Sequence, residues 1–178
     1  MLIWAIALQI LLVAYHQVTT LVDFYPFNGV RFYKWRERLL EAGFNLALMT
    51  PSPVGFIFGW SWLMRFGVAY YFILLACECA TWWLPYFFGG SPKWEEIYAR
   101  VQGQTHSVLP RRGKNPAPNV EHLILMALTL ATAIVTLWAY SALPGATFQG
   151  WWIGVLFGVV MVWGVVTQCC RVGTKKGQ

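Results

Sequence analysis

The feature that most constrains the fold is the length of the apolar blocks along the chain. Residues 1–21, 120–141 and 150–170 each contain no lysine or arginine. A helix needs about 20 predominantly apolar residues to cross the hydrocarbon core of a bilayer. The apolar residues come in blocks rather than in amphipathic periods, so the pattern predicts membrane-spanning helices and not the core of a soluble domain.

Composition agrees with this prediction. Only 11% of the residues are charged and 58% are hydrophobic, whereas soluble domains carry roughly 25% charged residues. The first block lacks the basic region and the small-residue cleavage site of a signal peptide, so we interpret it as a retained span.

The number of spans depends on the longer apolar stretch at residues 42–89, which is interrupted by Pro51, Pro53 and the region 60–65. This stretch could hold one span or two. The segments on either side, 22–41 and 90–119, are both basic and should both face the cytoplasm under the positive-inside rule. Two loops on the same side require an even number of crossings between them. The sequence therefore predicts two spans here, with an outer turn near residues 61–65.

The predicted fold is all-α: a multi-pass bundle of five spans that forms a single domain over residues 1–171, followed by a basic cytoplasmic tail at 172–178. Twelve of the 13 lysines and arginines lie in the two basic loops, in the tail and at Arg171 directly before it, which predicts an outside N-terminus and a cytoplasmic C-terminus. The expected location is a bacterial inner membrane. The spans are expected at about residues 1–21, 42–60, 66–88, 120–141 and 150–170.

Each basic loop is predicted to contain a short helix at the membrane interface, because each mixes cations with apolar residues at helical spacing. In the second loop, Ser91 and Pro92 have the residue types of an N-cap and a first helical position.

Ionisable residues inside the predicted spans are the first candidates for a site. Glu78 lies near mid-bilayer, where a charge is costly, so its side chain should face the bundle. His16, Glu121 and His122 should approach the same cytoplasmic leaflet. We predict an inward-facing pocket formed by these four residues, in which they are candidate catalytic acids and bases. The alternative is that they reflect only the greater polarity of helix ends.

Arg111, Arg112 and Lys114 form a cluster just before the fourth predicted span. Arginine forks and a lysine at a membrane surface suit a phosphate or another anionic head group. These three residues are therefore candidates for binding a substrate or a lipid head group, unless they serve only to orient the chain.

Glycines four residues apart mark close contacts between membrane helices. Gly150, Gly154 and Gly158 form one such series, and Gly55 and Gly59 form a second. The contacts can lie within the chain, between two copies of it, or with a partner subunit.

No cofactor or metal site is indicated by a motif. The chain lacks the histidine boxes of membrane desaturases, a prenyl-diphosphate motif, a haem-attachment motif, a nucleophile elbow and a P-loop. Cys77 and Cys79 point to different sides of a helix and cannot bind one metal together. Axial haem ligation by His16 or His122 stays open. Nucleic-acid binding is not expected, because the cations lie in short loops.

Three functions remain. The first is an accessory or assembly subunit of a larger membrane complex, or a lipid-associated module, with membrane lipids and other membrane subunits as partners. The second is a small intramembrane enzyme that acts on a lipid, isoprenoid or quinone through the Glu/His pocket. The third is an oligomeric proton-coupled transporter that uses Glu78.

Overall fold

The structure, a computed structural model, describes residues 1–146. The fifth predicted span lies outside the described residues, together with Gly150, Gly154 and Gly158. Within residues 1–146 the regular structure is entirely helical. The helices are α1 (Leu2–Leu21), α2 (Trp35–Met49), α3 (Pro51–Phe58), α4 (Ser61–Glu78), α5 (Leu84–Phe88), α6 (Pro92–Arg100) and α7 (Val120–Ser141), with 3₁₀ turns η1 (Val30–Phe32) and η3 (Gln102–Gln104) and a π-helical turn η2 (Cys79–Trp83).

Three helical segments of the described part of the chain are long and apolar enough to cross a membrane. They are α1, the continuous helix Ser61–Phe88 formed by α4, η2 and α5, and α7. This confirms the prediction of an all-helical structure for the described residues, with three helices apolar enough to span a membrane. The count of five spans and their orientation stay predictions.

Residues 22–60 are divided differently from the prediction. They were expected to form an interfacial helix and then a span. Helix α2 begins at Trp35, where the Glu37 carboxylate accepts a hydrogen bond from the Lys34 backbone N–H at 3.0 Å. It continues without a break through residues 41 and 42, where the boundary was expected. Helix α2 ends at Met49, because Pro51 starts a new helix, α3. The first position of a helix tolerates proline, since the backbone N–H that proline lacks would have no partner within the helix there.

The turn after α3 lies at Gly59 and Trp60, earlier than the turn expected at residues 61–65. Gly59 adopts the left-handed conformation with φ of 73°, which ends helices without the penalty that a side chain would incur. Residues 61–65 are therefore the first turn of α4.

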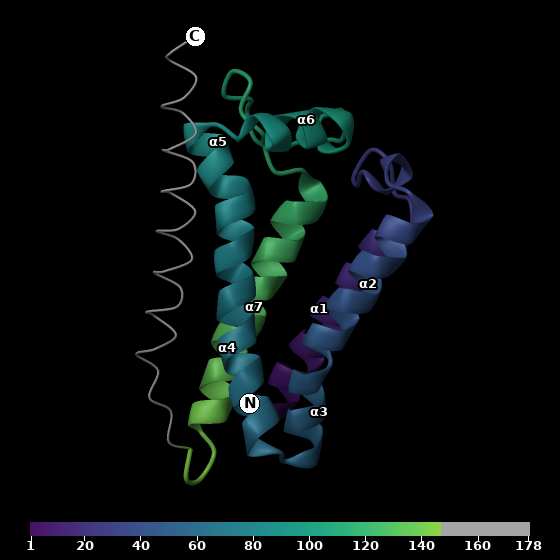
Figure 1. Cartoon of the computed structure of the whole chain (residues 1–178). Helices are drawn as coiled ribbons and strands as arrows, with labels where there is room; N and C mark the ends of the chain where they lie inside the picture. The colour runs from purple at the N-terminus through teal and green to yellow at the C-terminus, as the bar shows by residue number, and fades with distance from the viewer. Residues whose placement is uncertain (147–178) are drawn as a thin grey trace.

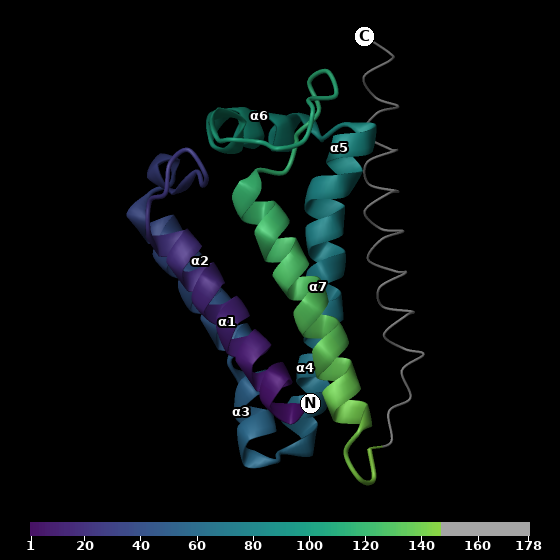
Figure 2. The same cartoon turned by 180° about the vertical axis from the view of Figure 1, so that it is seen from behind.

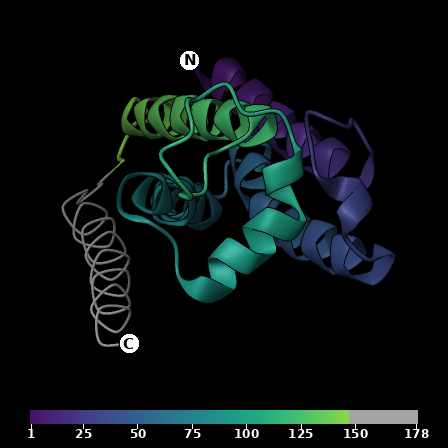
Figure 3. The same ribbon diagram turned by 90° about the horizontal axis from the view of Figure 1, so that it is seen from above.

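The helices form two pairs that diverge toward one end of the molecule (Figures 1 and 2). Helix α2 lies along α1, and α4 lies along α7, while α1 also packs against α7. A core cluster of four buried residues joins both pairs, with one residue from each of α1, α2, α4 and α7: Leu12, Met49, Tyr71 and Ala133. Helix α6 lies across the other helices at one end, which Figure 3 shows from above. We call this end, with residues 22–34 and 89–119, the loop end.

At the opposite end, α3 and α4 approach each other at two glycines. A Cβ atom added to Gly55 would lie 2.5 Å from the Cβ of Leu63, and one added to Gly67 would overlap the Ser52 side chain. Gly59, by contrast, has nothing within 4 Å of a built Cβ. Of the predicted pair, Gly55 thus lies at a helix contact, whereas Gly59 forms a turn.

We expect Gly67→Ala to lower the free energy of unfolding by about 1–3 kcal/mol, because the added methyl group overlaps Ser52 in a tightly packed contact. Gly43→Ala is the matched control, since a Cβ at that helical position meets nothing within 4 Å. It should raise stability by up to about 1 kcal/mol through helix propensity. Thermal unfolding in detergent measures both. Equal effects of the two variants would contradict the close contact.

Candidate functional site

The two loops at the loop end contact each other and close this end of the bundle. The backbone N–H of His106 donates to the carbonyl oxygen of Pro26 at 2.7 Å. The ring of Phe27 meets the His106 ring edge-on, with centroids 6.4 Å apart. Gly29 fits against Val101 so closely that an added Cβ would lie 2.8 Å from that side chain. Residues distant in the sequence are thus brought together above α1 and α7.

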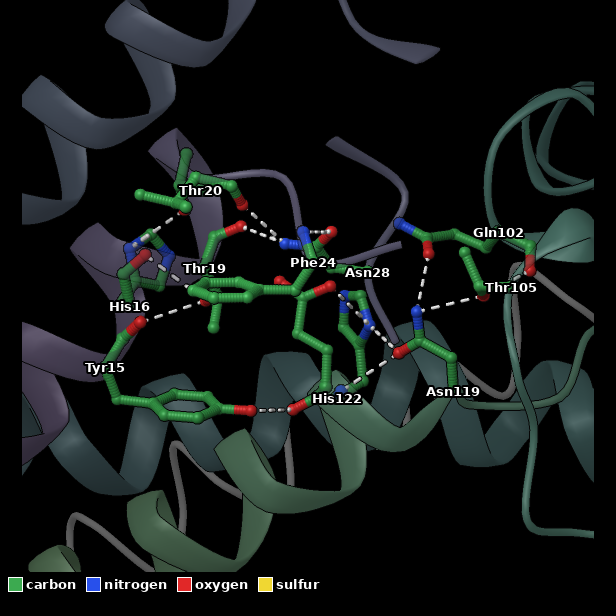
Figure 4. A network of polar contacts seen from close by, with 12 residues as sticks. Tyr15, His16, Thr19, Thr20, Phe24, Asn28, Gln102, Thr105, Asn119 and His122 are labelled. Atoms are coloured by element: carbon green, nitrogen blue, oxygen red, sulfur yellow. Dashed lines mark hydrogen bonds and ion pairs between the residues drawn. The ribbon is translucent and has the colours of Figure 1, made fainter. Parts of the chain in front are cut away.

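Asn119 is the centre of the polar network shown in Figure 4 and is 1% exposed. Its side-chain oxygen accepts from the backbone N–H of His122 at 3.0 Å, which caps α7 and identifies that atom as the oxygen. Its amide nitrogen donates to Gln102 Oε1 at 2.8 Å and to Thr105 Oγ1 at 3.1 Å. One side chain therefore fixes both the start of α7 and the loop above it.

Asn119 also assigns the tautomer of His122. The same Asn119 oxygen lies 2.6 Å from His122 Nδ1. A carbonyl oxygen only accepts hydrogen bonds, so Nδ1 carries the hydrogen in this network. In the neutral ring, Nε2 is then the nitrogen that can take up a proton. Trp82 covers this ring, with centroids 4.0 Å apart.

The C-terminal end of α1 is held by Asn28 and Arg38. Asn28 Nδ2 donates to the carbonyl oxygens of Thr19 and Val22 at 3.0 and 2.8 Å. Arg38 Nε donates to the Thr20 carbonyl at 3.3 Å, and Arg38 Nη2 donates to the Leu21 carbonyl. The last carbonyls of a helix lack partners within the helix and carry partial negative charge. The cation of Arg38 is therefore engaged by α1.

A small cavity of about 50 Å³ lies between these elements. We call it the polar cavity. Its volume suffices for water, which needs roughly 10–15 Å³ of probe-occupied space. Burial raises the pKa of the Glu41 carboxyl and the pKa of the Tyr33 phenol, both outside the three spanning helices. The polar cavity is lined by Thr19, Thr20, Gly29, Val30, Tyr33, Arg38, Glu41, Gln102, Glu121 and His122.

A larger, apolar groove of about 490 Å³ runs along α1 and α7 beside the polar cavity. We call it the α1–α7 groove. Thr19 and Glu121 line both spaces. The two spaces therefore share a wall, with polar groups on one side and apolar groups on the other. The groove is lined by Leu11, Ala14, Tyr15, Val18, Thr19, Phe24, Phe27, Asn28, Val120, Glu121 and Ile124.

The four residues of the predicted pocket are placed at two levels. Glu121 and His122 line the polar cavity. His16 is buried one turn before Thr20, with Nδ1 3.4 Å from the Thr20 hydroxyl. Glu78 is not among the described residues that line the cavity. Its Oε1 accepts from Thr129 Oγ1 at 3.0 Å, two turns further along α7, and its Oε2 has no partner within residues 1–146.

The three cations that were predicted to bind a head group lie outside the polar cavity and the α1–α7 groove. Arg111 and Lys114 line a separate hollow of about 420 Å³ together with Glu95. Arg112 lies over the rings of Tyr86 and Phe87, 5.7 and 5.2 Å from their centroids. None of the three is among the described residues that line the polar cavity or the α1–α7 groove.

Sequence reasoning missed the residues that organise this site. Asn119 directly precedes the apolar run of α7, which is the sequence signal of an N-cap. Arg38 and Glu41 are three residues apart, the spacing that places side chains on the same side of a helix. Both had been assigned to a surface helix, and the packing of α2 against α1 brings them to the wall of the polar cavity, where Arg38 is half-buried and Glu41 stays exposed. Among residues 1–146, no group of three or more His, Cys, Asp or Glu side chains is placed to hold a metal ion.

Comparison of the chain with protein-family models, with curated proteins and with solved structures found no match. The function is therefore argued from the geometry of the chain itself.

We expect Asn119→Ala to destabilise the protein by about 2–3 kcal/mol, since it removes a helix cap and leaves buried polar groups without partners. Asn119→Asp keeps the acceptor for His122 but loses the donors to Gln102 and Thr105, so its loss should be smaller. Asn45→Ala is the control, because half-buried Asn45 donates to a carbonyl of its own helix. Thermal unfolding of the three variants tests this order, and an Asn119→Ala protein as stable as Asn45→Ala would refute it.

Proposed function

We propose that this protein is a non-catalytic, lipid-associated module of the membrane that binds an amphipathic molecule. The apolar chain of the ligand occupies the α1–α7 groove and its polar head lies at Glu121. The observation that carries this proposal is that Thr19 and Glu121 line both an apolar groove and a polar cavity, which therefore lie side by side. An amphipathic molecule has the same division, into an apolar chain and a polar head.

The dimensions and surroundings of the groove support a lipid-like ligand. Its volume lies within the roughly 300–1,000 Å³ that small-molecule sites occupy. Leu11, Val18 and Ile124 in its wall are 50%, 45% and 44% exposed. On a membrane-spanning helix such side chains face hydrocarbon, so an alkyl chain would pass from the lipid into the groove without leaving an apolar environment.

We further propose that the protein has five spans and that the loop end faces the cytoplasm of a bacterial inner membrane. The distribution of Lys and Arg supports this orientation, because Arg65 alone lies away from the basic loops and the tail. The ligand would then be taken from the inner leaflet. As an accessory subunit, the module would hold this molecule within a larger assembly.

Filling the groove tests the proposal. The probe is an alkylamine with a diazirine in its chain, added to the full-length protein in phosphatidylcholine nanodiscs. We expect Ala14→Phe to reduce photolabelling of α1 and α7 by about tenfold, which corresponds to about 1.4 kcal/mol, because its ring occupies the chain site. Ala7→Phe, on an exposed position of the same helix outside the groove, should label like the native protein. Equal labelling of all three proteins would refute a chain site here.

A second candidate function is that of an intramembrane enzyme, with Glu121 as acid and His122 as base. One observation favours it: both residues line the cavity beside the groove, and the tautomer of His122 leaves Nε2 as a proton acceptor.

Incubation of the native protein and of Glu121→Gln with a total lipid extract distinguishes the two functions. If the protein only binds, mass spectrometry will find no lipid that is consumed by the native protein, and Glu121→Gln will change only what is retained. Consumption of one lipid by the native protein, and not by Glu121→Gln, would establish the enzyme and overturn the non-catalytic module.

A further inference from the structure

Resting on the proposed function, we propose that the head group bound at the polar cavity is a protonated amine attached directly to an apolar chain, and not a phosphate or a carboxylate. The polar cavity itself carries this inference, through the charges that line it, the partners those charges already have, and its size.

The charges that line the cavity favour a cation. Two carboxyls, those of Glu41 and Glu121, and one guanidinium, that of Arg38, belong to its wall. Burial raises the pKa of the Glu41 carboxyl, and a bound cation would favour its ionised form again. The remaining polar groups of the wall are neutral: the hydroxyls of Thr19, Thr20 and Tyr33 and the amide of Gln102, with the His122 ring.

The single guanidinium is already engaged. Arg38 donates through Nε and Nη2 to the carbonyls of Thr20 and Leu21, where the end of α1 attracts a positive charge. These two bonds use two of the five N–H donors of Arg38, so an anion could reach only the donors that remain. It would also have to lie beside two carboxyl groups.

The acceptors match an ammonium group in number. An ammonium group has three N–H donors and no acceptor. Glu41, Glu121 and the hydroxyl of Thr19 offer three acceptors, on α2, α7 and α1 respectively. The Glu121 carboxyl also has side-chain hydrogen bonds to Thr19 and Asn119. Because Glu121 and Thr19 also line the α1–α7 groove, an amine bound at these residues would place its chain beside the groove.

The size of the cavity is compatible with a small head. A space of about 50 Å³ holds a primary amine, since one water needs roughly 10–15 Å³ of probe-occupied space.

Competition among amphiphiles that differ only in their heads tests the inference. The diazirine alkylamine is bound to the full-length protein in phosphatidylcholine nanodiscs, and labelling that survives in Ala14→Phe is subtracted as non-specific. Unlabelled competitors carry the same alkyl chain with an amine, a hydroxyl, a carboxylate or a phosphate head. We expect the amine to compete at least about tenfold better than the carboxylate or the phosphate, a difference of about 1.4 kcal/mol, with the alcohol between them.

Variants locate the preference. Glu121→Gln and Glu41→Gln should each reduce the advantage of the amine over the alcohol by about fivefold or more, while thermal unfolding confirms that each protein is folded. Glu96→Gln, an exposed position on α6, should leave the advantage unchanged. The two carboxyls lie on different helices. If one variant fails to fold, the other still tests the inference.

The outcomes separate the two proposals. Competition by phosphate or carboxylate that equals competition by the amine would overturn the head-group assignment and leave the chain site intact. An unchanged amine advantage in both carboxyl variants would overturn the assignment to this cavity. The absence of specific labelling by matched diazirine probes with all four heads would overturn the chain site itself, and the head-group assignment with it.

Discussion

The arrangement of the bundle depends on hydrogen bonds that α7 makes to its neighbours inside the apolar interior. A polar group in hydrocarbon has no water to bind, so it must find a partner on another helix. Gln9 of α1 donates to the Thr136 hydroxyl at 2.9 Å, and the Thr129 hydroxyl donates to Glu78 of α4 at 3.0 Å. Both threonines are fully buried. These bonds set the position of α7 against α1 and α4, and with it the position of the residues that begin α7.

The site at the loop end follows from that placement. Once α7 is fixed, Asn119 lies where it can cap the helix and bind the second loop, and Glu121 faces the end of α1. The Tyr15 hydroxyl donates to the Glu121 backbone carbonyl at 3.0 Å, which ties the two helices beside the cavity. The polar cavity is thus built from helix ends and loops, while the groove beside it is built from helix sides.

Much of the helical framework could be predicted from the sequence, because the length and apolarity of α1 and α7 follow directly from their residues. The cap at Ser91 was also predictable, and its hydroxyl accepts from the Trp94 backbone N–H at 3.2 Å. The inward direction of Glu78 follows from the cost of exposing a carboxyl to lipid. These features depend only on local sequence and on the solvent.

The rest depends on how helices are placed against one another. Periodicity puts Thr129 on the same face as His122, but the register of α4 against α7 decides that Glu78 meets Thr129 rather than the cavity. Nothing local distinguishes an Arg38 that faces lipid head groups from one that binds the end of α1. The division of residues 35–58 depends on Pro51 and Gly59, whose effects were recognised only as interruptions of an apolar stretch.

The contact between the two loops has a consequence for how any ligand would arrive. The His106 to Pro26 hydrogen bond and the close fit of Gly29 against Val101 hold the two loops together at the loop end. The α1–α7 groove, in contrast, is lined by exposed side chains of α1 and α7 such as Leu11 and Ile124. Under the proposed function, a molecule would reach Glu121 sideways from the bilayer. Occupancy would then follow the mole fraction of that molecule in its leaflet, and the aqueous concentration would matter only through partitioning.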